Sequence, residues 1–228
     1  PPLLEALAHG LPLLLRDLAP PPESLLRQIA PEKCPPEVWA AKAVGTLSKT
    51  CCELATRVRR ETVMEPPVRV LGWLYSSMSL LVCRTSQSAL DTQLDSNFCS
   101  ATNSLCGTLL GLLFDDKSGV SPAAVTAEGT LALVLTGVCC LARVSPCLRS
   151  GFGGIVRDLS NMPPAFMTDR RRHVVIPSLL VLCMNDPSNV ATVREEMSTT
   201  HLTKYLSRME NELGAYLADK EKVAAVGA

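Results

Sequence analysis

Apolar residues recur at steps of three and four along almost the whole chain, and clean alternation of apolar and polar positions is absent. A step of three to four places apolar side chains on one face of a helix, whereas a strand needs a period of two. Prolines at 20–22, 35–36, 66–67 and 122 separate the periodic segments, because a missing backbone N–H ends one helix or begins the next. The pattern predicts about eight to ten helices joined by short turns.

Two helix-start signals stand out. Ser121 before Pro122 is typical of an N-cap residue with proline at the first helical position, and Asp186 before Pro187 repeats the signal. In chain order we expect helices at 3–18, from the prolines at 35–36 to 58, at 71–82, at 90–113 with a break near Ser100, at 123–144, at 175–183 and at 202–217.

The segments 123–144 and 175–183 are apolar nearly all round, so we expect them to be the most buried helices, the second with Pro177 near its first turn. The predicted core therefore includes Leu133, Val134, Val138, Leu141, Leu179, Leu180 and Leu182.

Internal repetition extends this prediction. Leu141–Pro146 (LARVSP) and Leu182–Pro187 (LCMNDP) both place a polar residue and a proline directly after an apolar helix, about 40 residues apart. That period is typical of armadillo and HEAT repeats. The predicted fold class is all-α, an armadillo/HEAT-like α-solenoid forming a single elongated helical domain.

The domain limits follow from the same segments. The chain begins at Pro1 without a methionine, so we expect residues 1–34 to be N-terminal helices that continue an upstream domain. Residues 35–228 are predicted to form the armadillo-like domain, with C-terminal repeats at 123–218.

Charge and cysteine usage narrow the class of protein. Lys+Arg and Asp+Glu both number 22 and the pI is near 7.2, so bulk charge does not favour nucleic acid or anionic lipid. The ten cysteines include no C-x-x-C pair and the chain has no N-glycosylation acceptor. We expect reduced, metal-free core thiols, with disulfides or zinc as alternatives. The longest apolar run, 129–142, is shorter than the ~20 residues of a membrane span, which predicts a soluble segment.

No arrangement of residues supports catalysis, a cofactor or a metal. The glycines of GFGG (151–154) could cradle a phosphate, but a helix rather than a strand precedes them and no lysine follows, so an inter-helix turn with positive φ is favoured. His9, His173 and His201 lack a cysteine or carboxylate at metal-ligand spacing, and the seven-residue step from Cys99 to Cys106 suits core packing better than zinc. We expect a protein that is not an enzyme.

The sharpest surface feature is the run Asp169-Arg170-Arg171-Arg172-His173. Arginine forks match both carboxylate and phosphate, so the run could bind an acidic protein or an RNA backbone. The alternative is a solvated helix cap that Asp169 partly neutralises. The candidate partner-binding residues are Arg170, Arg171, Arg172 and His173, with Lys204 and Arg208 on the outward side of the last helix.

The series from Ser150 to Ser198 resembles the C-terminal region of the family of S phase cyclin A-associated proteins residing in the endoplasmic reticulum. The matching signals, at similar spacing, are Ser150-Gly151, Met162-Pro163, Phe166, Asp169-Arg170, Pro177-Ser178-Leu179, Cys183, Asn185 and Glu196-Met197-Ser198. The likeness covers about the last third of the chain.

The resemblance implies a large helical adaptor that is linked to cyclin A, to cilia and to the decay of tubulin messages on translating ribosomes. In that decay the family bridges a ribosome-bound reader of nascent tubulin to the deadenylase complex. The implied function is a non-enzymatic scaffold in the cytoplasm, at the endoplasmic reticulum surface or at the cilium. A ribosome- or RNA-binding module that acts through the arginines, with contact to ribosomal RNA, is the alternative.

Overall fold

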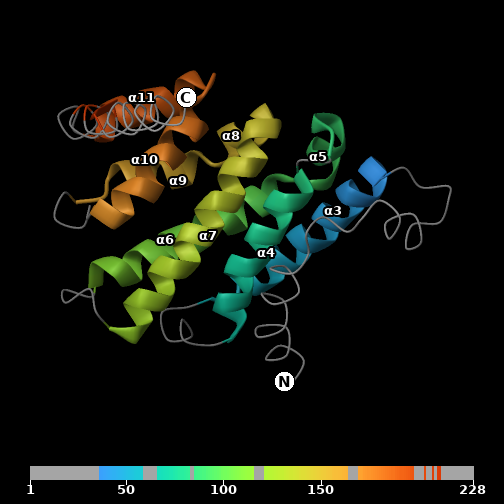
Figure 1. The fold of residues 1–228 in the computed structure, drawn as a ribbon, viewed down its shortest axis with the longest axis horizontal. Coiled ribbons are helices and arrows are strands. Elements are labelled where there is room, and N and C mark those ends of the chain that lie inside the picture. Colours follow the sequence, from blue (N-terminus) through green and yellow to red (C-terminus); the bar gives the residue numbers. More distant parts are fainter. Residues whose placement is uncertain are drawn as a thin grey trace, which may run out of the picture.

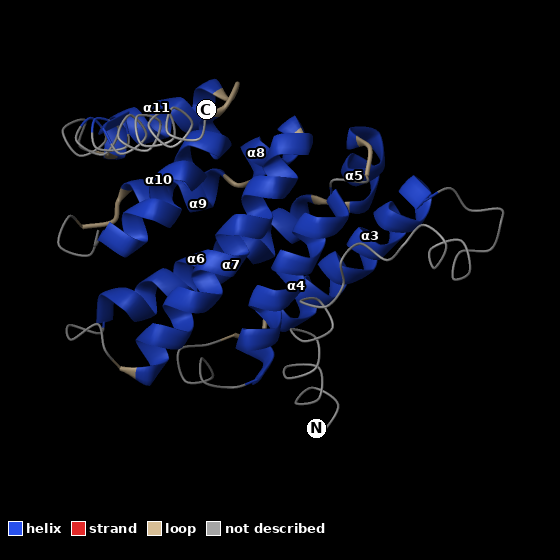
Figure 2. Cartoon of the chain, viewed as in Figure 1, coloured by secondary structure: helices blue, strands red, loops and turns tan. Residues whose placement is uncertain are grey.

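The computed structural model describes residues 36–58, 66–82, 85–115, 121–163 and 169–197, together with positions 203, 207, 210 and 211. Within these residues all regular secondary structure is helical (Figure 2), so the predicted all-α class is confirmed. The helix expected at 3–18 and most of the one expected at 202–217 lie outside the described residues. The helices are α3 (Pro36–Ala55), α4 (Pro66–Val82), α5 (Gln87–Gln93), α6 (Ser96–Asp115), α7 (Pro122–Val144), α8 (Pro146–Gly151), α9 (Gly153–Ser160), α10 (Asp169–Cys183) and α11 (Pro187–Glu196).

The two cap-plus-proline signals begin helices as predicted. Ser121 Oγ accepts a hydrogen bond from the Ala124 N–H at 3.1 Å at the start of α7. An Asp186 carboxylate oxygen accepts one from the Asn189 N–H at 3.0 Å at the start of α11. Each cap satisfies a backbone donor that has no partner within its own helix, a contribution of about 0.5–2 kcal/mol.

The helices form two rows that pack on each other (Figure 1). In one row α4 packs against α7, and α7 against α10; in the other α3 packs against α6, and α6 against α9. The short helices α5, α8 and α11 each pack against a member of the second row, α3, α6 and α9 in turn. The same three-part unit of short helix, second-row helix and first-row helix thus occurs twice in succession, as α5–α6–α7 and α8–α9–α10.

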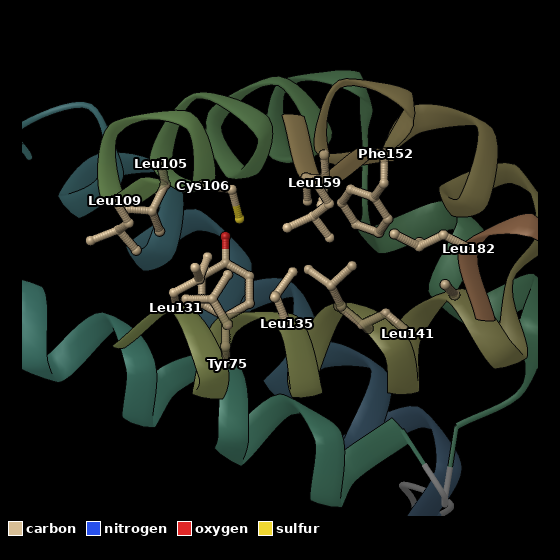
Figure 3. Packing of buried hydrophobic residues seen from close by; sticks show 14 of the residues in the cluster. Tyr75, Leu105, Cys106, Leu109, Leu131, Leu135, Leu141, Phe152, Leu159 and Leu182 are labelled. Atoms are coloured by element: carbon tan, nitrogen blue, oxygen red, sulfur yellow. The ribbon is translucent and has the colours of Figure 1, made fainter. Parts of the chain in front are cut away.

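The core lies between the rows and is built mainly from leucine (Figure 3). The Tyr75 hydroxyl forms a 2.6 Å hydrogen bond with Thr102 Oγ1, so its polar end is satisfied although the ring is fully buried. Phe98 stacks on Tyr75 at 5.9 Å between ring centroids and meets Phe152 edge-on at 6.3 Å. These aromatic contacts link α4, α6 and the turn after α8 in one apolar interior.

Glycines let α4 and α7 approach each other closely. A Cβ on Gly137 would lie 2.6 Å from the Tyr75 carbonyl oxygen, and a Cβ on Gly72 would lie 3.0 Å from Leu133 Cδ1. Because real Cβ atoms essentially never come within 3.0 Å of backbone, Gly137 is required where α7 meets the backbone of α4.

Three predictions about the helices are wrong in detail. The break expected near Ser100 lies at Leu94–Asp95, where an Asp95 carboxylate oxygen accepts the Phe98 N–H at 2.9 Å and starts a new helix. The helix expected at 175–183 begins at Asp169, so Pro177 lies in its interior. Pro177 and His173, four residues before it, are both exposed, so the proline lies on the solvent side of the helix.

The predicted core is confirmed at Val134, Val138, Leu141, Leu179 and Leu182, which are all buried. Leu133 is only partly buried. Leu180 is wrong: it is 45% exposed, because it lies on the side of α10 that faces away from both α7 and α9. A Leu180→Ala change therefore does not empty a core position.

The prediction that the longest apolar segment is too short to span a membrane also changes. Of the helices in the described residues, α7 is long and apolar enough to cross a membrane by length and composition, and half of its most apolar window is buried inside the protein.

Candidate docking surface

The large apolar side chains that stay exposed within the described residues all belong to one row of helices. They are Leu80 in α4 (57% exposed), Val125 in α7 (55%), and Leu180 and Met184 in and directly after α10 (45% and 51%). Clustered exposed apolar surface is typical of interaction sites, whereas scattered single residues need no explanation.

We call the outward side of this row the row face. Its exposed members are Arg69 and Leu80 in α4; Val125, Gly129, Thr136 and Arg143 in α7; and His173, Pro177, Leu180 and Met184 in and after α10. Their steps of three, four, seven and eleven residues are close to whole numbers of helical turns and place each helix's members on one side. Trp73 of α4 and Leu133 of α7 are partly exposed between them.

The three helices are held in parallel and in a defined register. Gly72 faces Leu133, while Tyr75, further along α4, faces Gly137 further along α7. Glu128 near the start of α7 meets Arg171 near the start of α10. At the other end, Arg149 donates hydrogen bonds to the carbonyl oxygens of Ala142 and Met184, which brings the ends of α7 and α10 together.

This register gathers specific residues at the C-terminal end of the row. Leu80 is near the end of α4, Arg143 is in the last turn of α7, and Met184 directly follows α10. The cationic side chain of Arg143 thus lies between two helix ends that each carry an exposed apolar side chain, Leu80 on α4 and Met184 after α10.

A small cleft of about 60 Å³ opens between α7 and α10 near the other end of the row. Its lining is apolar apart from Glu128 and Arg171, and it includes Gly129. A Cβ on Gly129 would meet nothing within 4 Å. This glycine therefore leaves open space over the cleft, in contrast to Gly137 on the buried side of the same helix.

The arginine run lies at the start of α10 and only part of it faces solvent. The Arg171 guanidinium contacts a Glu128 carboxylate oxygen at 3.5 Å, and the two side chains are only 11% and 21% exposed. Arg172 is partly buried and His173 is exposed. Arg171 therefore joins α10 to α7, which fits neither a fully solvated cap nor three equivalent arginines aimed at a partner.

The remaining candidates stay predictions. The Arg170 and Asp169 side chains and all of Lys204 and Arg208 lie outside the described residues. Among the candidates whose side chains the structure describes, His173 is exposed, and Arg171 and Arg172 are partly buried.

Sequence reasoning missed a buried polar junction where α8 meets the start of α11. The Asn189 side-chain amide donates to the carbonyl oxygens of Arg149 at 3.0 Å and Leu182 at 2.9 Å. Ser150 Oγ donates to Asp186 at 2.6 Å, and Arg149 itself is only 7% exposed. The Ser150 and Asn189 hydrogen bonds hold the pKa of Asp186 below its ordinary value.

A second asparagine binds backbone groups of the same region from the other side, from α6. Asn103 of α6 donates to the Gly151 carbonyl oxygen at 3.0 Å and accepts the Ile155 N–H at 3.2 Å. Both asparagines satisfy backbone groups of the turn regions around α8 and α9. The only sequence signal for them was a polar residue at an otherwise buried helical position.

GFGG is an inter-helix turn, as predicted, but the predicted reason is wrong. None of its glycines has the positive φ that favours glycine. Instead, a Cβ on Gly151 would lie 2.6 Å from Cys99 Sγ, and one on Gly154 would lie 2.9 Å from the Asn103 side chain. Glycine is needed there because the turn lies against α6.

The described cysteines are free thiols, and burial raises the pKa of Cys51, Cys52, Cys99, Cys106, Cys139 and Cys183. For Cys99 the pKa rises to about 11. Thiols that remain protonated at neutral pH are poor nucleophiles and poor metal ligands. In the part of the chain that the structure describes, no three His, Cys, Asp or Glu side chains form a group suited to a metal ion.

No family model, curated protein or solved structure matches the chain. The function is therefore argued from the row face and from the packing that holds it.

Proposed function

We propose that the protein is a non-enzymatic scaffold, an armadillo-like α-solenoid that docks an extended segment of a partner protein on its row face. The observation that carries the proposal is the restriction of exposed large apolar side chains to α4, α7 and α10. Exposed leucine and methionine lose contact with water when a partner covers them, which favours binding by about 25 cal/mol for each Å² of apolar area buried.

The arrangement of helices supports the solenoid part of the proposal. Two successive units place a short helix, a second-row helix and a first-row helix in the same order, and α11 follows with a side-chain N-cap like that of α8. In a solenoid, each unit contacts only its neighbours, and the stacked helices leave an extended surface for partners. The row face is such a surface, formed from several units rather than from one loop.

The resemblance of the last third of the chain adds an expected setting for this scaffold. It implies a role in cell-cycle and ciliary regulation and in co-translational tubulin mRNA decay, with cyclin A, the nascent-tubulin reader and the deadenylase complex as the expected partners. The pairing of Arg171 with Glu128 favours protein docking over an RNA contact through three equivalent arginines.

The proposal is tested by selecting binders from a displayed library of unstructured random peptides and mapping them by hydrogen exchange. We expect the selected peptides to slow exchange in α4, α7 and α10. Gly129→Phe should weaken the binding of those peptides that slow exchange at the start of α7, because a Cβ at this position meets nothing within 4 Å and the ring extends into the open space beside the cleft.

Ser104→Phe is the matched control, since Ser104 is exposed on α6 in the other row. It adds the same ring and should leave binding unchanged. The thermal unfolding of both variants is measured first, so that lost binding is not lost folding. Selected peptides that protect only α3, α6 or α9 would contradict the proposal, as would peptides that protect the start of α7 and still bind Gly129→Phe as well as the unchanged protein.

A further inference from the structure

We infer that the row face takes an acidic partner segment that also carries apolar side chains, with Arg143 as its main charged contact. The inference rests on the proposed function and specifies the chemistry of the partner. It is carried by the neighbourhood of Arg143 and by the distribution of charge over the three helices.

The neighbourhood of Arg143 is mixed in character. Leu80 and Met184, each more than half exposed, lie on the two helices beside it, and Leu180 is one turn before Met184. Cys139 and Cys140, one turn before Arg143 on α7, are partly buried. A partner carboxylate that binds Arg143 would therefore bring the partner's adjacent side chains against Leu80 and Met184. This arrangement favours a partner in which apolar residues stand next to the acidic one.

The charge on the row is one-sided. The charged members of the row face are Arg69 and Arg143, and both are exposed. α4 contains no Asp or Glu, and Glu128, the only one in α7, is paired with Arg171. The only one in α10 is Asp169, whose side chain lies outside the described residues. Asp186, at the C-terminal end of the row, is only 6% exposed and lies beside the buried Arg149, and Asp91 belongs to α5, which packs on α3 in the other row. A segment with negative charge meets a complementary potential here, whereas a basic segment does not.

The same features distinguish a protein segment from a nucleic acid. Binding through phosphates needs many cations, since each contact neutralises one charge, and nucleic acid gains little from leucine and methionine. The row face has few exposed arginines, and exposed apolar side chains lie next to Arg143. An acidic and apolar peptide fits both properties.

The length of the segment follows from helix packing. Adjacent packed helices are about 8–10 Å apart, so the row spans roughly 16–20 Å from α4 to α10. An extended chain covers that span with about six residues at ~3.3 Å each. A peptide of about ten residues leaves room for contacts at both ends.

The experiment uses three fluorescent peptides of this length with matched sequences. The first combines Asp and Glu with Leu, the second has Lys at every acidic position, and the third has Ser at every Leu. We expect the first to bind, and to bind more weakly as salt is raised, because exposed charges are screened. The Lys peptide should not bind. Loss of the leucines should weaken binding at least about tenfold, since one buried leucine contributes about 1.5–3 kcal/mol.

Two charge reversals test the assignment to Arg143. Arg143→Glu should weaken the acidic peptide about three- to tenfold, as expected when an exposed attraction becomes a repulsion. Arg157→Glu is matched to it, since Arg157 is also exposed in the last turn of its helix but belongs to α9 in the other row. It should leave the affinity unchanged.

The inference is overturned if the Lys peptide binds as well as the acidic one, or if Arg157→Glu weakens binding as much as Arg143→Glu. A single-stranded RNA oligonucleotide that binds the row face more tightly than the acidic peptide would overturn it as well. Library peptides that protect the row face but are basic or uncharged would refute the inference and leave the proposed scaffold function in place. Absence of any peptide on the row face would refute both.

Discussion

α4 and α7 meet through apolar side chains and bare backbone, whereas α8 and the start of α11 meet through buried hydrogen bonds. The contact between α4 and α7 depends on Gly72 and Gly137 and on apolar leucine side chains. The second depends on Arg149, Asn189 and the Asp186 carboxylate. The two contacts join similar units by different physical means.

The difference has consequences for how each contact fails. An apolar contact at close range loses stability when volume is added, because the backbones must separate. A buried polar junction loses stability when one partner is removed, because the remaining donor or acceptor is left without water or protein to bind. The apolar contact should be indifferent to pH, and the polar junction should respond to it.

The largest effect is expected at the polar junction, from Arg149→Met. The side chain donates to the carbonyl oxygens of Ala142 and Met184 from a position that is 7% exposed. Hydrogen bonds to charged groups contribute about 1.5–3 kcal/mol each, so loss of both should lower the free energy of unfolding by roughly 3–6 kcal/mol. Denaturant unfolding measures this, and a change under about 1 kcal/mol would show that the apolar length of the side chain matters more than its hydrogen bonds.

A smaller effect is expected at the apolar contact, from Gly137→Ala. The added methyl group would meet the Tyr75 carbonyl oxygen at 2.6 Å, and overpacking of this kind costs typically about 1–3 kcal/mol. Gly129→Ala is the matched control on the exposed side of α7. It should stabilise the protein by about 0.5–1 kcal/mol, because alanine is the better helix former and its Cβ meets nothing. Equal effects of the two changes in thermal unfolding would mean that α4 and α7 are not in close contact.

The smallest effects are those of pH, and they have opposite signs at two aspartates. The pKa of Asp186 is lowered by its hydrogen bonds to Ser150 and Asn189, so its contribution is present above the unfolded pKa near 3.8 and is lost as pH falls through the lower folded value. Burial raises the pKa of Asp158, so its charge opposes folding at neutral pH and this opposition disappears as pH falls through the raised value.

Two asparagine variants separate these contributions. Asp186→Asn keeps a residue that can cap a helix, and it should be less stable than the unchanged protein at pH 7 but nearly equal in acid. Asp158→Asn should be more stable at pH 7, with the difference also vanishing in acid. Urea unfolding at several pH values measures both, and a pH-independent difference for Asp186→Asn would exclude a role for its charge at the junction.

Signals that act within one helical turn were sufficient for the fold class and for most helix starts. The caps at Ser121 and Asp186 lie three residues from the N–H groups that they bind, so the sequence alone contains both partners. The relation between LARVSP and LCMNDP could be predicted for the same reason. Ser145 accepts the Leu148 N–H at 3.3 Å just as Asp186 accepts that of Asn189, and in both segments proline follows the cap.

The row face could be predicted only in part. His173 was identified as a candidate, but Leu80, Arg143 and Met184 were not, because an exposed leucine or methionine looks like a core residue in a sequence. Neither the cleft beside Gly129 nor the pairing of Arg171 with Glu128 could be predicted, since each depends on how α10 lies against α7.

The sequence by itself determined that this chain is helical, where its clearest caps lie and which prolines separate its segments, because those features depend on neighbours within a few residues. Only the tertiary structure decided which sides of the helices are buried. Residues 174–183 are apolar apart from Ser178, so their period could not place Leu179 inside at 2% exposure and Leu180 outside at 45%. Nor could it show that Asn189 binds the Arg149 carbonyl oxygen 40 residues away, because a hydrogen bond of that separation exists only once the helices have packed.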